Sequence, residues 1–228
     1  MEADGHCRGC GSLYVVATPI GNLGDITIRA IDTLKTVDVI ACEDTRRTKI
    51  LTSRYGINTP LISFFAHNEV RKTAFLIEKL KEGKSVALVS DAGTPGISDP
   101  GYVIIRASID NAIPVVCIPG PSALISALVI SGKPTNKFVF EGFLSNKSGK
   151  RRRRLEELKT EERTVILYES PHRIINLLAD IADIMGNRQI ICVRELTKKF
   201  EEILRGEAAS LADTFRQNPP KGEFTVII

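Results

Sequence analysis

The sequence predicts an α/β fold of two domains that meet at a cleft, with a parallel sheet in the N-terminal domain and a mixed sheet in the C-terminal domain. Short runs rich in β-branched residues alternate with segments of helical periodicity along the chain. The first strand-like runs are apolar almost throughout, which is typical of parallel strands covered on both faces. With 228 residues, the chain is long enough for two small cores.

The N-terminal domain is expected to contain five strands with helices between them. In the helical segment 68–82, Val70, Ala74, Ile77 and Leu80 are spaced to form one apolar face. The predicted strands are LYVVAT (13–18), VDVIAC (37–42), LISFF (61–65), SVALVS (85–90) and PVVCI (114–118).

A polar segment with Gly and Pro, 131–137, predicts the domain boundary, so the domains are expected at 13–133 and 134–228. The segment 172–185 has a one-sided apolar stripe at helical spacing. Strand-like runs on both sides of a helix at 207–217 indicate the mixed sheet. The C-terminal elements are FVFEGF (138–143), a helix at 150–161, TVILYE (164–169), the helix 172–185, QIICVRE (189–195), FEEILRG (200–206) and EFTVII (223–228).

Residues 1–12 are interpreted as a leader or tag, because they lack an apolar signal region and Gly11-Ser12 looks like a cloning remnant. His6, Cys7 and Cys10 are three possible zinc ligands without an evident fourth, and no other segment predicts a metal site. The other cysteines lie in apolar runs and are expected to be buried; they are Cys42, Cys117 and Cys192. Prolines interrupt the uncharged stretch 111–132, so we expect no membrane span and a cytoplasmic protein.

The net charge of +4 is concentrated in one place. Six of the eight residues from 147 to 154 are basic: Lys147, Lys150, Arg151, Arg152, Arg153 and Arg154. A solvated helix face is the ordinary explanation of such a run. The neighbouring Gly and Ser favour a mobile basic loop instead, which would bind phosphates of RNA without reading its sequence.

Three strands of the first domain end in loops rich in Gly, Pro, Asp and Ser, at 18–25, 90–101 and 119–123. In open α/β sheets, ligands bind beyond the carboxyl ends of the strands. Such loops let the backbone approach a ligand closely. Turn formation alone is the alternative, and neither a GxGxxG nor a Walker A motif is present.

Other strand ends carry charged residues, and three of these are arginines at expected helix starts: Arg46, Arg47 and Arg173. Helix capping accounts for Asp44, Thr45 and Ser170. It does not account for the arginines, because a cation at a helix start opposes the helix dipole. An anionic partner explains them better.

Six segments, taken in order and spacing, closely resemble the ribosomal small-subunit RNA 2′-O-ribose methyltransferase I family, of the tetrapyrrole (corrin/porphyrin) methylase superfamily. The resemblance covers the chain from residue 11 or 12 to residue 228. The segments are VATPIGNLGDIT (16–27), CEDTR (42–46), SDAGTPGISDPG (90–101), PGPSA (119–123), YESPHR (168–173) and RELTK (194–198).

The resemblance implies a cytoplasmic homodimer that binds S-adenosylmethionine in the cleft between its two domains. It also implies, as substrate, a decoding-region cytidine in small-subunit (16S) ribosomal RNA, free or in the assembled 30S subunit. The cofactor residues that it implies are Pro19, Asp91, Ala92, Gly93, Thr94, Pro95, Ile97, Ser122, Ala123, Phe143, Leu144 and Tyr168. Family members usually continue past the strand that matches GEFTVII, so the part that a C-terminal extension plays in RNA binding is open.

A ribose hydroxyl needs a base to accept its proton, and the residues offer several. Glu169 and His172 are the first candidates, with Glu43 and Asp44 behind them. The three arginines at helix starts and the basic run would hold RNA phosphates. Two alternatives are a methylase of the superfamily with a tetrapyrrole or protein acceptor, and a non-catalytic RNA-binding ribosome assembly factor.

Overall fold

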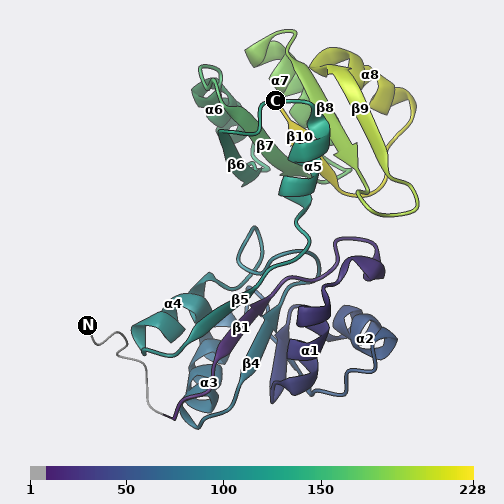
Figure 1. The fold of residues 1–228 in the computed structure, drawn as a ribbon. Coiled ribbons are helices and arrows are strands. Elements are labelled where there is room, and N and C mark those ends of the chain that lie inside the picture. The colour runs from purple at the N-terminus through teal and green to yellow at the C-terminus, as the bar shows by residue number, and fades with distance from the viewer. Residues whose placement is uncertain (1–8) are drawn as a thin grey trace. The chain divides into compact units, whose positions relative to one another are not determined.

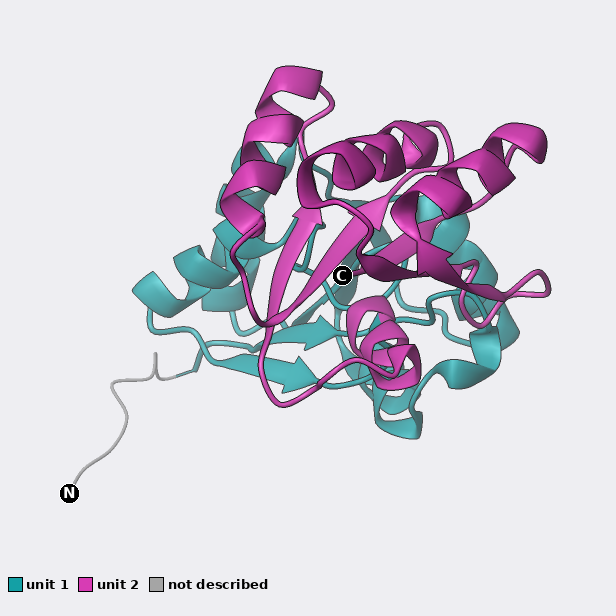
Figure 2. Ribbon diagram, turned by 90° about the horizontal axis from the view of Figure 1, so that it is seen from above, with its two compact units in different colours: residues 1–122 teal, residues 123–228 magenta. Residues whose placement is uncertain are grey.

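The computed structural model describes residues 9–228, which divide into two compact units between Ser122 and Ala123 (Figure 2). The division falls earlier than the boundary expected near residue 133. The cause is helix α5 (Ala123–Ser131), whose Leu124, Ala127 and Leu128 pack against strands of the second unit. The polar segment that follows α5 is therefore a connection inside the second unit.

The first unit is built on a five-stranded sheet in the order β3-β2-β4-β1-β5, and every strand pair in it is parallel, as predicted. β2 and β4 are buried along their whole length, which explains their continuous apolar sequences. The strands are β1 (Leu13–Val16), β2 (Val39–Cys42), β3 (Leu61–Ser63), β4 (Val86–Val89) and β5 (Val115–Ile118).

Helices cover both faces of this sheet (Figure 1). Leu34 of α1 and Leu51 of α2 pack on one face, and Leu76 and Leu80 of α3 pack on the other face together with Ile104 of α4. The helices are α1 (Ile28–Thr36), α2 (Thr45–Arg54), α3 (Glu69–Lys81) and α4 (Tyr102–Asp110), with a short 3-10 helix at Leu23–Asp25.

The second unit contains a mixed sheet, as predicted, and the order of its strands is β6-β7-β10-β8-β9. β6 and β7 are parallel, whereas β10 runs antiparallel to both β7 and β8, and β9 runs antiparallel to β8. The strands are β6 (Phe138–Phe143), β7 (Thr164–Glu169), β8 (Gln189–Arg194), β9 (Glu202–Glu207) and β10 (Phe224–Ile227). Consequently β6, β7 and β8 all end at the same edge of the sheet.

Three helices cover one face of the second sheet, and α5 packs on the other (Figure 1). The three helices are α6 (Ser148–Leu158), α7 (Ile174–Met185) and α8 (Ala208–Gln217). The predicted stripe of α7 is confirmed, because Ile174, Leu177 and Ile181 are fully buried. In the part of the chain that the structure describes, no helix is long and apolar enough to cross a membrane.

Residues 10–12 belong to the first unit, so the interpretation of a leader reaching residue 12 is wrong. The Gly11 N–H donates to Leu80 O at 2.8 Å, and Ser12 O accepts from the Val86 N–H. A Cβ on Gly11 would lie 2.0 Å from Lys84 O, so glycine is required at this close approach. Of the three possible zinc ligands, only Cys10 is described, and His6 and Cys7 lie outside the described residues, so the zinc hypothesis stays untested.

Two further expectations are wrong in detail. Cys117 is exposed, because β5 is an edge strand, although Cys42 and Cys192 are buried as expected. In α3, Val70 is 76% exposed, and the buried face instead uses Thr73, Leu76, Ile77 and Leu80.

Candidate active site

The three Gly- and Pro-rich loops of the first unit converge at the carboxyl edge of its sheet. Thr18 and Gly93 form an isolated antiparallel bridge, with N–H···O distances of 2.8 and 3.0 Å. Gly93 has φ +80°, and a Cβ on it would lie 3.5 Å from Ile20 Cγ2 and 3.8 Å from Pro121 O. Residues of all three loops therefore lie around one glycine backbone, as the topology predicts.

Asp91 fastens the start of α2 to this edge. Its Oδ1 accepts from the Asp44 N–H at 3.0 Å, and its Oδ2 forms an ion pair with Arg47 at 3.3 Å. Both carboxylate oxygens thus have partners inside the unit. These contacts make Asp91 a positioning residue of this edge, and its implied contact with the cofactor stays a prediction.

Asp44 is the N-cap of α2 and accepts from the Arg46 N–H at 2.8 Å. The Arg46 guanidinium binds the same carboxylate, and these contacts lower the pKa of Asp44 to about 2. Burial raises the pKa of the neighbouring Glu43, and Asp91 adds to this effect. Arg46 and Arg47 are therefore paired with acids of the unit, although the Arg46 side chain stays 90% exposed.

Glu69 helps to hold the loop 90–101 in place, a role that its sequence position does not predict. Its Oε1 accepts from the Gly101 N–H at 2.9 Å and the Val103 N–H at 3.3 Å, at the start of α4. This carboxylate caps the helix and anchors the end of the loop 90–101. An acidic residue within an amphipathic helix gives no signal in the sequence for a partner 32 residues away.

At the carboxyl edge of the second sheet, the implied cofactor residues separate onto two faces. Tyr168 and Phe143 are neighbours in register, with ring centroids 5.7 Å apart, and the Leu124 N–H of α5 donates to the Tyr168 hydroxyl. Leu144 instead belongs to the core beneath α6, α7 and α8. The α5 face of this edge is thus aromatic, and the opposite face carries the charged residues described next.

Glu169 is the last residue of β7 and is only 1% exposed. Its Oε1 accepts from the Ser170 N–H at 2.8 Å. Its Oε2 lies 3.1 Å from Arg173 Nη2 but accepts no hydrogen bond within the described residues. Burial raises the pKa of this carboxyl, while the Ser170 N–H and Arg173 act against the shift.

Arg173 joins the ends of two neighbouring strands. Besides its ion pair with Glu169, its Nη2 donates to Leu144 O at 2.5 Å. The Arg173 Nε is buried and has no hydrogen-bond partner within the described residues. Arg173 is therefore a positioning residue of this edge. Its expected contact with RNA phosphates stays a prediction, and its Nε is the donor that has no partner in the described residues.

His172, the other candidate base, is exposed on the same loop, whereas Glu169 is buried below it. The described residues offer His172 no hydrogen-bond partner. No group of three or more His, Cys, Asp or Glu within residues 9–228 is arranged to hold a metal ion. Of the two first candidates, only Glu169 is buried, and burial raises the pKa of its carboxyl.

The basic run is helical rather than a loop, because α6 begins at Ser148. Most of its arginines have partners inside the unit: Arg151 and Arg152 bind Asp180, and Arg154 binds Glu141 through two hydrogen bonds of 2.8 and 2.6 Å. Arg152 also binds Asp183, and Arg153 and Arg154 pair with Glu157. Only three of the six cations are exposed: Lys147, Lys150 and Arg153.

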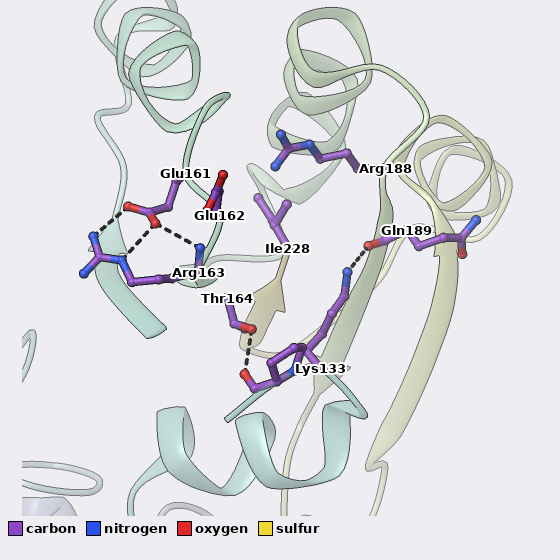
Figure 3. A pocket seen from close by; sticks show the side chains of 9 residues that line it. Lys133, Glu161, Glu162, Arg163, Thr164, Arg188, Gln189 and Ile228 are labelled. Carbon is purple, nitrogen blue, oxygen red and sulfur yellow. Dashed lines mark hydrogen bonds and ion pairs between the residues drawn. The ribbon is translucent and has the colours of Figure 1, made fainter. Parts of the chain in front are cut away.

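A cavity of about 240 Å³ lies at the opposite edge of the second sheet (Figure 3). It is lined by the starts of β7 and β8 and by the end of the chain after β10, with Lys133, Arg163 and Arg188 among its side chains. The Lys133 Nζ donates to Gln189 O at 2.8 Å across it. None of the predicted site residues lines this cavity, which fits their placement at the carboxyl edge.

Solved structures with the same fold include enzymes of tetrapyrrole and cobalamin synthesis. Diphthine synthase matches with a TM-score of 0.75 at 14% identity, covering 96% of this chain and 90% of that one. The methyltransferase CobJ matches with a TM-score of 0.72 at 17% identity over 95% and 93% of the two chains. At these identities the likeness confirms the predicted fold alone.

Sequence relatives are much more similar. A protein named ribosomal RNA small subunit methyltransferase I from Synechocystis sp. is 52% identical, over 96% of this chain and 78% of the relative. The protein of the same name from Thermotoga maritima is 48% identical, over 96% and 98%. The family model described as "Tetrapyrrole (Corrin/Porphyrin) Methylases" matches residues 12–212. The chain therefore belongs to the ribosomal RNA small subunit methyltransferase I family, within the tetrapyrrole methylases.

Proposed function

We propose that this protein transfers a methyl group from S-adenosylmethionine to the ribose 2′-hydroxyl of a cytidine in the decoding region of small-subunit (16S) ribosomal RNA. The names of its relatives support ribosomal RNA as the substrate and methyl transfer as the reaction. The observation that carries the proposal is the buried Glu169, whose Oε2 accepts no hydrogen bond from the described residues. Besides its ion pair with Arg173, this oxygen keeps a lone pair that could accept the proton of a substrate hydroxyl that reaches it.

The carboxyl edge of the first sheet is the proposed binding site for S-adenosylmethionine. Gly93 has a positive φ of +80°, and its backbone lies beside Ile20 and Pro121 of the two other loops, so the three loops meet where a ligand beyond the strand ends would bind. Thr94 and Ile97 belong to the same loop. The Ile97 side chain is apolar but 43% exposed, so it offers an apolar surface to a ligand. When bound, S-adenosylmethionine supplies a methyl group on a sulfonium, which an alcohol oxygen displaces in line.

Glu169 is the base in this proposal. A ribose hydroxyl is a poor nucleophile until a base accepts its proton, and a carboxylate with a raised pKa accepts it more readily near neutral pH. The Ser170 N–H and Arg173 fix the orientation of the carboxylate through Oε1 and the ion pair. In this proposal Phe143 and Tyr168, on the α5 face at the end of the same strand pair, contribute to binding the cofactor, whereas Leu144 is buried in the core on the other face.

In this proposal the RNA phosphates contact the predicted cations that are exposed, which are Arg46, Arg47, Lys147, Lys150 and Arg153. Phosphate contacts position an RNA without reading its sequence. The protein acts in the cytoplasm as a homodimer, on free ribosomal RNA or on the assembled 30S subunit. Light scattering of the purified protein tests the dimer.

The decisive experiment is mass spectrometry of small-subunit RNA from cells with and without this protein. We expect loss of one 2′-O-methyl group in its absence. Calorimetric titration with S-adenosylmethionine separates an enzyme from an RNA-binding assembly factor, because the factor would bind no cofactor. Unchanged RNA together with methylation of a protein or tetrapyrrole would contradict the proposed substrate.

For the base, Glu169→Gln keeps the size of the side chain and removes its proton acceptor. We expect it to lower single-turnover methylation by about 10²- to 10⁴-fold while cofactor affinity stays unchanged. His172→Ala serves as its comparison at the same loop. Full methylation by both variants would show that neither residue is the base.

A further inference from the structure

Arg194 and Glu169 occupy equivalent positions in the second sheet. Both residues pair in register with Phe224 of β10, one from each side. Residues in register project to the same face of a sheet, so Glu169 and Arg194 lie on the face covered by α6, α7 and α8. Two strand spacings separate their backbones by about 10 Å.

The same edge gathers most of the unsatisfied polar groups of the described chain. Five buried side-chain N or O atoms in residues 9–228 have no hydrogen-bond partner, and three of them are Glu169 Oε2, Arg173 Nε and Arg194 Nε. Leaving buried polar atoms unpaired costs free energy, so a group of them at one place needs an explanation. Glu169 Oε2 keeps its ion pair with Arg173, so the Nε groups of Arg173 and Arg194 are the donors left for a polyanionic ligand at this edge.

Arg194 is held so that part of its guanidinium stays available. Its Nη2 forms an ion pair with Glu202 Oε2 at 3.0 Å, and its side chain is 23% exposed. An arginine has five N–H donors, and this pair uses only one side of the group. The remaining donors suit an oxygen-rich anion such as a phosphate.

The RELTK loop that begins at Arg194 is strained and tightly held. Glu195 and Thr197 both have positive φ, 51° and 67°, although neither is a glycine. Glu195 Oε1 accepts from the Lys198 Nζ at 2.8 Å and the Glu223 N–H at 3.1 Å. Non-glycine residues in this conformation persist only where the surroundings impose it, and they concentrate at functional sites.

We propose that Arg194 is a further substrate-binding residue, which takes a backbone phosphate of the RNA on the same face as Glu169. This inference rests on the proposed function, because the substrate must be a polyanion with a hydroxyl near a phosphate. The carboxylate of Glu169 then meets the ribose, and the guanidinium of Arg194 meets the phosphate. Glu202 limits the binding strength, because it partly neutralises the guanidinium.

Two variants of one ion pair test the proposal with opposite expected signs. Arg194→Gln is expected to weaken the binding of a labelled small-subunit RNA fragment by about tenfold, and to reduce its salt slope by about 0.7. Glu202→Gln frees the guanidinium and is expected to tighten RNA binding by roughly twofold to fivefold. Binding is measured by fluorescence anisotropy at several salt concentrations, and cofactor affinity by calorimetry.

Arg205→Gln is the matched control, since Arg205 lies exposed on the adjoining strand β9, with its guanidinium bound to Ile130 O. We expect it to leave RNA affinity unchanged. Arg194→Lys keeps the charge without the planar fork, and its affinity is expected between those of wild type and Arg194→Gln. This second variant keeps the test decisive if the glutamine variant unfolds.

Equal weakening by Arg194→Gln and Glu202→Gln would show that the pair is only structural and would overturn the inference. Wild-type affinity and salt slope in both Arg194 variants would overturn it as well. If wild-type protein methylates the RNA, either result leaves the proposed function intact. If wild-type protein binds S-adenosylmethionine but neither binds nor methylates the RNA, the proposed function fails, and the inference fails with it.

Discussion

Arg151 and Asp180 form a buried ion pair that joins α6 to α7. The Arg151 Nε donates to Asp180 Oδ2 at 2.7 Å, and the two side chains are only 7% and 12% exposed. Asp180 Oδ1 accepts a further hydrogen bond from Arg152 at 2.9 Å. One carboxylate thus holds two arginines of the basic run, which makes much of that run part of the fold.

Asp180→Ala is expected to lower the free energy of unfolding by about 3–5 kcal/mol, because it leaves the Arg151 guanidinium buried without its partner. Arg153→Ala changes an exposed residue of the same helix and is expected to cost less than about 0.5 kcal/mol. Urea denaturation of both variants measures the difference. Similar midpoints for the two would contradict a structural role for the Arg151–Asp180 pair.

The exposed cations of the basic run are expected to supply its attraction for RNA. Replacing Lys147, Lys150 and Arg153 by Ala should reduce the slope of log affinity against log salt concentration by about 2, if each contacts one phosphate of a single strand. Cofactor affinity is expected to stay unchanged. Filter binding or anisotropy over a salt series measures the slope.

The matched control removes three exposed cations elsewhere in the same unit, Lys159, Arg216 and Lys221. Both triple variants lower the net charge equally, so a general charge effect would change both slopes alike. If the slope of log affinity against log salt concentration changes equally in the two variants, the side chains of Lys147, Lys150 and Arg153 form only a solvated helix face.

The sequence was sufficient to predict the two sheets and the edge at which the loops meet. Apolar strands alternating with helices leave few other topologies, and strand ends such as Thr18 and Ser90 then fall at one edge. The sequence did not predict which charged side chains pair with one another. Arg151 and Asp180 are 29 residues apart, and only the packing of α6 on α7 brings them together. For the same reason α5 could not be assigned to the second unit, since its apolar surface fits either sheet.

Gly93→Ala is expected to weaken S-adenosylmethionine binding. The positive φ of +80° makes alanine unfavourable by roughly 1–2 kcal/mol, and the new Cβ would lie in ordinary contact with Ile20 and Pro121, where the three loops meet. Gly132→Ala has the same φ of +80° with nothing within 4 Å, so it carries the backbone cost alone. Calorimetry and thermal melts are expected to show similar destabilisation but weaker cofactor binding only for Gly93→Ala. Equal cofactor affinity in both would exclude Gly93 from the cofactor site.

Asp44 is expected to make stability fall in acid. Arg46 lowers the pKa of Asp44 from 3.8 to about 2 in the folded state, so the carboxylate contributes stability above pH 3.8. That contribution is lost as the pH falls from about 4 towards 2. Asp44→Asn keeps a good helix cap and removes the titration. Melting temperatures of the two proteins should therefore converge in this window, and a constant difference from pH 5 to 2 would contradict the assignment.

Glu169 is expected to act on stability in the opposite direction. Burial raises its folded-state pKa above the ordinary 4.5, so the folded protein holds the proton more tightly than the unfolded chain does. Relative to Glu169→Gln, the wild-type protein should therefore lose stability as the pH rises from about 4.5 through the raised pKa, and the difference should then level off. Thermal melts of both proteins over this range measure it.

The proposed base role adds a second expectation for the same pH window. Wild-type single-turnover methylation should rise as Glu169 loses its proton, whereas Glu169→Gln should lack this rise. The carboxylate would thus cost stability over the same pH range in which it becomes active, as expected of a buried catalytic group. A rate that rises while the relative stability stays flat would show that the rate follows the titration of a group other than Glu169.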